Sequence, residues 1–283
     1  MDQFLGFDTP YEKATHIVFG APFDGTTSFR PGTRFAGQAI RQESIGLEVY
    51  SPYQDQSVED YAICDVGDLE LPFGNPQKVL GLIYEEARQI LEDNKVPFLI
   101  GGEHLVSYGS IKAVWEKYPD LNIIHFDAHT DLREDYMGEM FSHATVIRRA
   151  WDLVGDDKIY QFGIRSGERE EFQWAQKHTH LTKFTTTGLA QVVEDLKDKP
   201  VYITIDLDIL DPSVFPGTGT PEPGGISFNE MMAAMGHLSQ LKKVVGADVV
   251  ELSPHYDHSG ISTAAACKVI RELMLAIQDK KSL

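Results

Sequence analysis

The sequence has few cysteines and no long apolar run. Two cysteines in 283 residues can form one disulfide at most, and in a chain of this size they are typical of buried thiols without a functional role. No uninterrupted apolar run approaches the roughly 20 residues that a membrane-spanning helix needs. The N-terminus also lacks the basic and apolar segments of a secretory signal. We therefore expect a cytoplasmic protein with no membrane partner.

Positive charge is also scarce. The chain has 25 Lys and Arg against 43 Asp and Glu, which gives a formal net charge of −18. Nucleic acids and anionic membranes attract proteins through basic patches, so this composition disfavours both as partners. A small cationic substrate fits the charge better.

Apolar, β-branched runs alternate with helix-like segments along the chain. The runs that predict strands are 15–20, 61–65, 96–100, 121–126, 158–163, 179–184, 201–205 and 243–251. The segments that predict helices are 37–48, 75–94, 105–117, 144–154, 168–177, 188–196, 228–238 and 263–277. In the helix over 75–94, the apolar face is expected to consist of Val79, Leu82, Ile83, Ala87, Ile90 and Leu91. We expect one α/β domain over residues 1–283, a doubly wound, mainly parallel sheet with helices on both faces.

Two of the predicted strands run directly into side chains that bind metals. The first leads into Asp127, His129 and Asp131, and the second into Asp206 and Asp208. Successive side chains of an extended chain point to opposite faces, so residues at two-residue spacing share a side wherever strand geometry persists. Each segment therefore presents a row of potential ligands.

A third segment adds a histidine, because the strand over 96–100 leads through Gly101 and Gly102 to His104. The carboxyl ends of parallel strands meet at one edge of a sheet, so His104 is expected near the two other segments. Four carboxylates in one partly buried pocket repel one another unless protons or divalent cations neutralise them. Two divalent cations would cancel their charge. A set rich in oxygen ligands, with two imidazoles and no thiolate, favours Mn²⁺ over structural Zn²⁺ and leaves Co²⁺, Ni²⁺ and catalytic Zn²⁺ open.

These segments resemble the ureohydrolase (arginase/agmatinase) family, and most closely its agmatinases. The motifs are Gly-Gly-Glu-His104, Asp127-Ala-His-Thr-Asp131 and Asp206-Leu-Asp208-x-x-Asp-Pro, and the similarity extends over nearly the whole chain. The resemblance implies two Mn²⁺ per subunit, bridged by Asp127 and Asp206. In that arrangement His104 and Asp131 complete one site, and His129 and Asp208 complete the other. It also implies a homo-oligomer, often a hexamer.

The resemblance assigns further side chains to the reaction. His143 matches a family histidine that acts in proton transfer, and Glu251 matches the carboxylate that holds the guanidinium group. We also place Thr220 and Glu222 in substrate binding. Three other histidines are set aside, because they are expected in the core or in loops: His125, His255 and His258.

The expected reaction is hydrolysis of agmatine to urea and putrescine, a step of polyamine biosynthesis, with a hydroxide between the metals as the nucleophile. The substrate's terminal ammonium would meet Glu134, Asp135, Glu139 or Glu222, whereas Arg133 could instead serve an anionic substrate. Hydrolysis of guanidinobutyrate, arginine or formiminoglutamate remains an alternative on the same metal site. A metal-binding homologue without catalysis is a further alternative.

Overall fold

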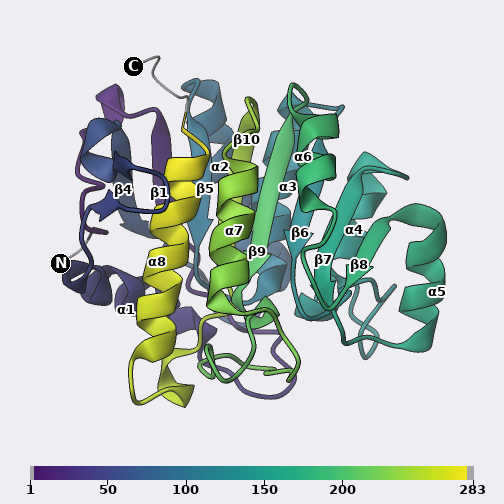
Figure 1. The fold of residues 1–283 in the computed structure, drawn as a ribbon. Coiled ribbons are helices and arrows are strands. Elements are labelled where there is room, and N and C mark those ends of the chain that lie inside the picture. Colours follow the sequence, from purple (N-terminus) through teal and green to yellow (C-terminus); the bar gives the residue numbers. More distant parts are fainter. Residues whose placement is uncertain (1–2, 279–283) are drawn as a thin grey trace.

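All eight strands of the central sheet run parallel in the computed structural model, which describes residues 3–278 (Figure 1). Their order across the sheet is β4-β1-β5-β10-β9-β6-β7-β8. The strands are β1 (His16–Gly20), β4 (Ile63–Asp68), β5 (Val96–Ile100), β6 (Asn122–Phe126), β7 (Ile159–Ile164), β8 (His180–Lys183), β9 (Val201–Asp206) and β10 (Val244–Val250). The predicted parallel α/β sheet is confirmed. A short antiparallel hairpin, β2 (Tyr50–Ser51) with β3 (Gln56–Ser57), was not predicted.

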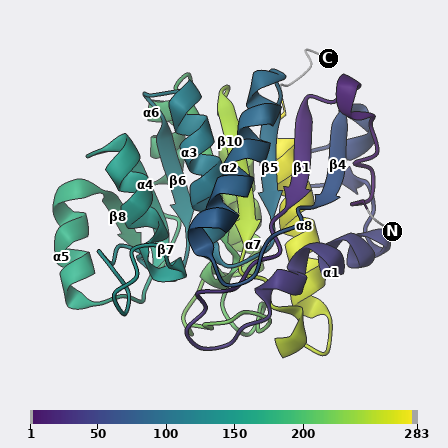
Figure 2. The ribbon, with the colours of Figure 1, turned by 180° about the vertical axis from the view of Figure 1, so that it is seen from behind.

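Helices cover both faces of the sheet, which explains why its central strands β5, β10, β9 and β6 are buried almost throughout. One face carries α1 (Ala36–Glu43), α6 (Leu189–Leu196), α7 (Phe228–Leu238) and α8 (Ile261–Ala276) (Figure 1). The other face carries α2 (Pro76–Glu92), α3 (Ser107–Lys117) and α4 (Val146–Val154) (Figure 2). Helix α5 (Arg169–His178) lies at the sheet edge beside β8.

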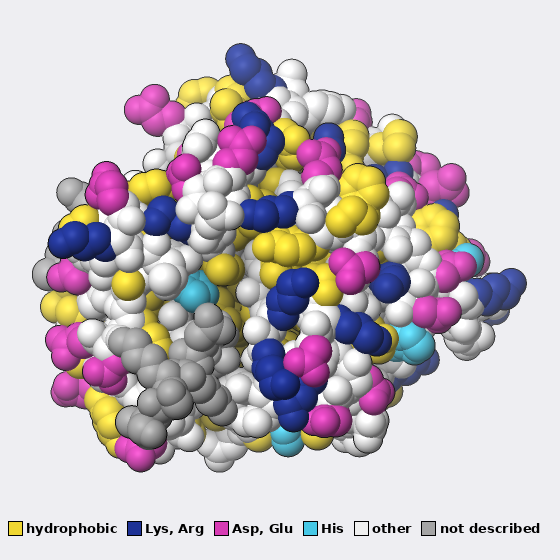
Figure 3. Space-filling model, turned by 90° about the horizontal axis from the view of Figure 1, so that it is seen from above, with side chains coloured by type: hydrophobic (Ala, Val, Ile, Leu, Met, Phe, Trp, Pro, Cys, Tyr) yellow, Lys and Arg dark blue, Asp and Glu magenta, His cyan; other side chains and the backbone are white. Residues whose placement is uncertain are grey.

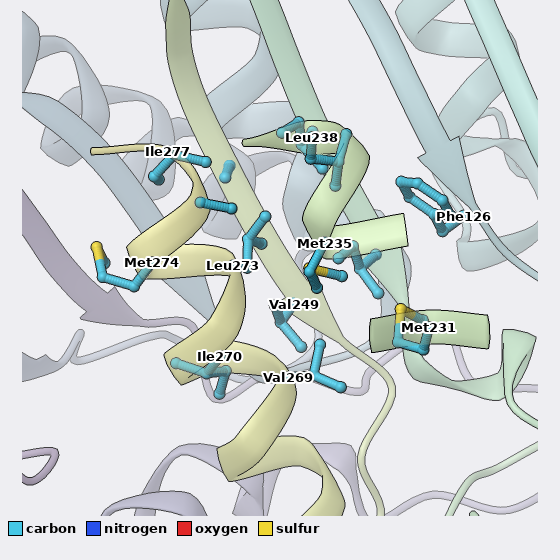
Figure 4. Close-up of a cluster of buried hydrophobic side chains, with 14 of the residues drawn as sticks. Phe126, Met231, Met235, Leu238, Val249, Val269, Ile270, Leu273, Met274 and Ile277 are labelled. Carbon is cyan, nitrogen blue, oxygen red and sulfur yellow. The ribbon is translucent and has the colours of Figure 1, made fainter. Parts of the chain in front are cut away.

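The core on the first face is formed mainly by leucine, isoleucine, valine and methionine. Met235 and Leu238 of α7, together with Ile270 and Leu273 of α8, lie around Val249 of β10 (Figure 4). All five side chains are buried. Burial of side chains of this kind contributes about 1.5–3 kcal/mol each to folding, which holds the carboxyl end of β10 in a fixed position.

Helix α2 begins close to the predicted residue and presents the predicted face to the core, with one exception. The Asn75 side chain accepts a hydrogen bond from Lys78 N, and Pro76 occupies the first turn, where its missing N–H costs nothing. The expectation that Leu82 lies in the core is wrong, because its side chain is exposed. Leu80 is buried in its place. Both lie near the edge of the apolar face, where helical spacing alone does not decide between them.

The predicted helix over 37–48 is shorter than expected. It ends at Glu43, and a 3-10 turn over Ser44–Gly46 follows. Ser44 donates its hydroxyl to Arg41 O and accepts a hydrogen bond from Leu5 N. These local bonds compete with continuation of the helix.

The carboxyl ends of the strands lie at the lower end of the molecule in Figures 1 and 2. There the loop over residues 21–34 and the loop over residues 210–226 lie side by side. Figure 3 shows the opposite end, where Lys and Arg side chains are interspersed with acidic and hydrophobic ones. Among residues 3–278, no helix has the length and apolar content needed to cross a bilayer.

Candidate active site

The side chains that the sequence marks as metal ligands come together at the carboxyl ends of β5, β6 and β9. Five of the six are buried, and His129 is partly exposed. The six are His104, Asp127, His129, Asp131, Asp206 and Asp208. Parallel strands bring these segments to one edge although up to about a hundred residues separate them in sequence.

His104 lies among three carboxylates. Its Nδ1 is 3.0 Å from Asp127 Oδ2, 3.0 Å from Asp131 Oδ2 and 3.4 Å from Asp206 Oδ2. Its other nitrogen, Nε2, is 3.0 Å from the hydroxyl of Thr204.

The neighbours of Thr204 indicate which ring nitrogen of His104 carries the proton. Thr204 donates its one hydroxyl hydrogen to Asp248 Oδ1 over 2.6 Å, so its oxygen can only accept from His104 Nε2. When His104 is neutral, as a metal ligand must be, the lone pair of Nδ1 therefore faces the carboxylates. Consistent with this, Nδ1 is buried and makes no hydrogen bond within residues 3–278.

A second group of potential ligands surrounds His129. Its Nδ1 lies 3.0 Å from Asp208 Oδ2 and 3.4 Å from Asp127 Oδ1. Asp127 therefore contacts both histidines, one through each carboxylate oxygen. Ligand atoms of Asp127, His129 and Asp208 all lie within 4.8 Å of one another.

The prediction that Asp127, His129 and Asp131 share one side because they continue a strand is wrong. Strand β6 ends at Phe126, and Asp131 has a φ of 53°, in the left-handed region. The turn is held by hydrogen bonds, since Asp127 accepts from His129 N and Asp208 accepts from Ala128 N. A structured loop replaces the alternation expected of a strand.

His125 belongs to this cluster, although the sequence analysis set it aside. It is buried in β6 as expected, but its Nε2 lies 2.8 Å from Asp127 Oδ2. Gln161 Nε2 lies 3.1 Å from Nδ1 of the same ring, which suits donation from His125 to Asp127. The signal in the sequence was the two-residue spacing of His125 and Asp127, which places both on one face.

The charges of the cluster are strongly coupled. Burial and the neighbouring Asp127 raise the pKa of Asp131 to about 7, and burial with Asp208 and Asp127 raises the pKa of Asp206 well above its ordinary value. Burial lowers the pKa of His104, but the surrounding carboxylates outweigh it and raise that pKa well above the usual range. These shifts show that the cluster requires positive charge, which protons or divalent cations can supply.

The donor set fits a metal centre. Carboxylate oxygens and imidazole nitrogens are ligands for Mn²⁺, Co²⁺, Ni²⁺ and Zn²⁺. Ligand atoms of His104, His125, Asp127 and Asp131 lie within 4.8 Å of one another, and Asp127 also belongs to the group around His129. The unsatisfied Nδ1 of His104 is the clearest sign that a cation suits this place.

Glu251 lies beside the cluster, immediately after β10. Its φ is 66°, so the predicted strand over 243–251 ends at Val250 and the Glu251 side chain leaves the strand pattern. The carboxylate accepts a hydrogen bond from His104 N over 2.7 Å. Burial and the nearby Glu103 raise the pKa of Glu251 well above its ordinary value.

The other two predicted substrate residues lie in the loop after β9. Thr220 donates to Asp208 Oδ2 over 3.4 Å and lines the cavity beside the cluster. Glu222 accepts from Ser166 Oγ over 3.0 Å, and its carboxylate is 3.9 Å from His129 Nε2. Arg165 anchors this loop by donating to the backbone oxygen of Glu222 over 2.8 Å and to that of Asp208 over 2.7 Å.

His143 lies across the cavity, in a 3-10 turn over His143–Thr145. Ser28 Oγ is 3.3 Å from its Nε2, and Ser142 Oγ is 3.3 Å from its Nδ1. Burial lowers the pKa of His143 to about 4. The predicted proton-transfer histidine is thus placed at the wall of the cavity, among hydroxyl groups.

The cavity has a volume of about 270 Å³, and its lining includes the partly exposed Arg133 and Tyr136 and the exposed Glu168, which mark its solvent side. None of the four acids that were expected to meet a substrate ammonium lines the cavity. Glu134, Asp135 and Glu139 are exposed, and Glu222 is partly exposed beside the lining residue Ser166. Arg133 and Tyr136, from the same segment as Glu134, do line the cavity, so position in the sequence did not distinguish the lining residues from the exposed acids. Glu168 and Glu171 line the cavity instead.

The remaining histidines and cysteines lie outside this site, as expected. His255 and His258 are exposed, and His255 packs against Phe35. Cys64 and Cys267 are buried free thiols.

The chain is similar to known proteins over nearly its whole length. The Arginase family model matches residues 14–276. The agmatinase of Bacillus subtilis is 50% identical over 275 residues, which cover 96% of this chain and 95% of that protein.

Two solved structures have the same fold. A crystal structure from Clostridium difficile, described provisionally as an agmatinase, has a TM-score of 0.93 at 55% identity and covers 95% of this chain and 98% of its own. Proclavaminate amidino hydrolase from Streptomyces clavuligerus has a TM-score of 0.89 at 30% identity, with 98% and 96% covered. The chain belongs to the arginase family.

Proposed function

We propose that this protein hydrolyses agmatine to urea and putrescine with two Mn²⁺ per subunit. The observation that carries the proposal is the position of Asp127, whose carboxylate oxygens face His104 on one side and His129 on the other. Such a shared carboxylate suits two cations. The agmatinase relative at 50% identity supports the choice of substrate.

Six side chains would hold the two cations, and Asp127 and Asp206 would be shared between them. His104 and Asp131 would serve one cation, and His129 and Asp208 would serve the other. When bound, two divalent cations make water a nucleophile at neutral pH and so supply what attack on a guanidinium carbon requires. Co²⁺, Ni²⁺ and Zn²⁺ share this ligand preference, so the identity of the metal is part of the proposal.

Glu251 would bind the guanidinium group. Its carboxylate is buried beside the cluster, and its raised pKa means that it needs a cationic partner to ionise fully. A planar guanidinium offers paired N–H donors that suit a carboxylate. Thr220 lines the cavity and would border the substrate on the side of the loop after β9. Glu222 would act on the same side from behind Ser166, a lining residue that donates to its carboxylate.

His143 would move the proton that the reaction requires. Collapse of the tetrahedral intermediate to urea needs a proton on the departing amine. The lowered pKa of His143 keeps the imidazole neutral near pH 7, so it can accept a proton and pass it on.

The alternative substrates are arginine, 4-guanidinobutyrate and formiminoglutamate. A second kind of alternative is that the protein binds metal but catalyses no reaction. A screen for urea release by Mn²⁺-loaded protein separates them. Agmatine is expected to be turned over fastest, and chelation is expected to abolish turnover. If no guanidino or formimino compound is turned over by fully loaded protein, the proposal fails and the metal-binding alternative gains.

The family resemblance also leads us to propose a cytoplasmic homo-oligomer, with a hexamer as the expected form. The mass of the protein in solution, measured by light scattering, tests the oligomeric state independently of activity.

A further inference from the structure

A buried carboxylate, Glu103, fastens the loop after β1 to the turn that carries His104. The Glu103 side chain is fully buried. Its two oxygens accept from Thr26 N over 3.2 and 3.0 Å, from Thr26 Oγ1 over 2.8 Å and from Thr27 Oγ1 over 3.0 Å. A buried carboxylate is costly without such donors. Thr26 is therefore held firmly in one place.

Thr26 in turn contacts His143, which is 117 residues away in the sequence. Its hydroxyl hydrogen is committed to Glu103, so its oxygen acts as an acceptor toward other groups. His143 N donates to this oxygen over 3.0 Å, and His143 Nδ1 lies 3.5 Å from it. One hydroxyl thus contacts both the backbone and the ring of His143.

The other side of the imidazole meets the same loop. Ser28 Oγ lies 3.3 Å from His143 Nε2 and lines the cavity. The ring of Tyr136 packs edge-on against the imidazole, with 5.7 Å between the centroids. The ring of His143 is therefore enclosed by hydroxyl groups on both nitrogens and by an aromatic ring.

We infer that Glu103, Thr26 and Ser28 are positioning residues that hold the His143 imidazole in the orientation that faces the cavity. The inference rests on the proposed function, in which His143 transfers a proton. Holding a proton-transfer group in one orientation raises turnover, because small displacements of such groups reduce rates by up to about a hundredfold. Local sequence patterns do not reveal these contacts, because Thr26 and Ser28 lie more than a hundred residues before His143 in the chain.

The test compares two replacements of Thr26 that differ in one hydroxyl group. Thr26→Val keeps the size of the side chain but removes the hydroxyl, and we expect kcat for agmatine to fall at least about tenfold with KM little changed. Thr26→Ser keeps the hydroxyl and is expected to retain kcat within about threefold. Equal losses in both variants would overturn the inference.

Thr27→Val is the matched control, because Thr27 also donates to Glu103 but has no contact with His143. It removes the same kind of bond from the same carboxylate. We expect it to lower the melting temperature about as much as Thr26→Val while leaving kcat within about threefold of the wild type. If Thr27→Val lost as much kcat as Thr26→Val, the loss would come from weakened anchoring of the loop and not from the contact of Thr26 with His143.

A spectroscopic measurement keeps the inference separate from the proposed function. If wild-type protein releases no urea from agmatine, the proposed function fails before any variant is compared. The ¹⁵N resonances of the His143 ring still report its surroundings. They are expected to shift in Thr26→Val and to stay in place in Thr27→Val, and unchanged resonances in both would sink the inference. Metal content is expected to match the wild type in all three variants.

Discussion

Arg133 donates from Nη2 to Glu168 Oε1 over 3.1 Å at the mouth of the cavity. Its Nε lies 3.7 Å from Glu171 Oε2, and its guanidinium lies over the ring of Tyr136 at 4.9 Å. Glu168, the N-cap residue of α5, and Glu171 in its first turn thus neutralise Arg133, the one Lys or Arg among the described residues that line the cavity.

We expect kcat/KM for agmatine to exceed that for arginine and 4-guanidinobutyrate by about ten- to hundredfold. The reason is that a terminal ammonium meets a cavity mouth rich in carboxylates, and such a pairing is worth about 1–3 kcal/mol when partly desolvated. Urea release at fixed pH with Mn²⁺ measures the ratio. A preference for 4-guanidinobutyrate would contradict the choice of agmatine and leave the metal site unaffected.

Glu168→Gln tests the pairing itself. Removing this carboxylate leaves Arg133 with Glu171 as its remaining acidic partner, so we expect the ratio of agmatine to 4-guanidinobutyrate activity to fall by about tenfold. Glu170→Gln is the matched control, since Glu170 is an exposed acid of the same turn that does not line the cavity. An equal change in both variants would point to general surface charge in place of the Arg133 contact.

Elemental analysis after reconstitution is expected to find two metal ions per chain. Asp127→Asn and Asp206→Asn are each expected to reduce occupancy of both sites together with turnover, because each removes a bridging charge. Asp135→Asn, in the exposed loop beyond the cluster, serves as the control. Full activity with one metal per chain, or two metals retained in Asp127→Asn, would refute the shared-carboxylate assignment.

For His143→Asn we expect kcat to fall by about a hundredfold or more while metal content stays the same, because the proposed role is proton transfer and not ligation. His255→Asn is a suitable control, since His255 is exposed and packs against Phe35 outside the cavity. Parallel loss of metal and turnover would place His143 among the ligands or the structural residues.

We expect the protein to lose stability in acid because of the buried His16. Burial at the start of β1 lowers its pKa from 6.5 to about 4. Between pH 4 and pH 6.5, His16 binds a proton in the unfolded chain but not in the folded chain. The contribution of His16 to the free energy of unfolding is therefore fully present above pH 6.5 and is lost as the pH falls toward 4. At pH 5 the cost is about 2 kcal/mol.

Urea denaturation at pH 7.5 and pH 5 measures this cost. His16→Gln is expected to reduce the difference in unfolding free energy between the two pH values by about that amount. His258→Gln, which replaces an exposed histidine, is expected to leave the difference unchanged. Identical pH dependence in wild type and His16→Gln would exclude His16 as the cause.

The sequence predicted the alternation of strands and helices and the ligand segments, because both depend on local patterns. Buried strands are apolar runs, and the ligands follow them at short spacing. It did not predict contacts that depend on the path of a loop. Glu134 and Asp135 lie between Arg133 and Tyr136, which line the cavity, yet both acids are exposed and do not line it.

His125 and Glu103 were missed for a different physical reason. A buried histidine in a strand and a glutamate in a glycine turn have ordinary structural explanations. Only the neighbours across the fold, Asp127 for the first and Thr26 for the second, reveal what these side chains hold in place.

The position of β10 between β5 and β9 has a consequence for the order of folding. β5 pairs with β10 at residues about 150 positions apart in the chain, such as Phe98 and Ala247. His104 follows β5 and Asp206 ends β9, so the two reach their final spacing only after β10 has been inserted between their strands. During synthesis, about 250 residues must therefore leave the ribosome before the cluster can assemble, because β10 ends at Val250. Long-range pairing of this kind is slow, and tight metal uptake would mark the last stage of folding.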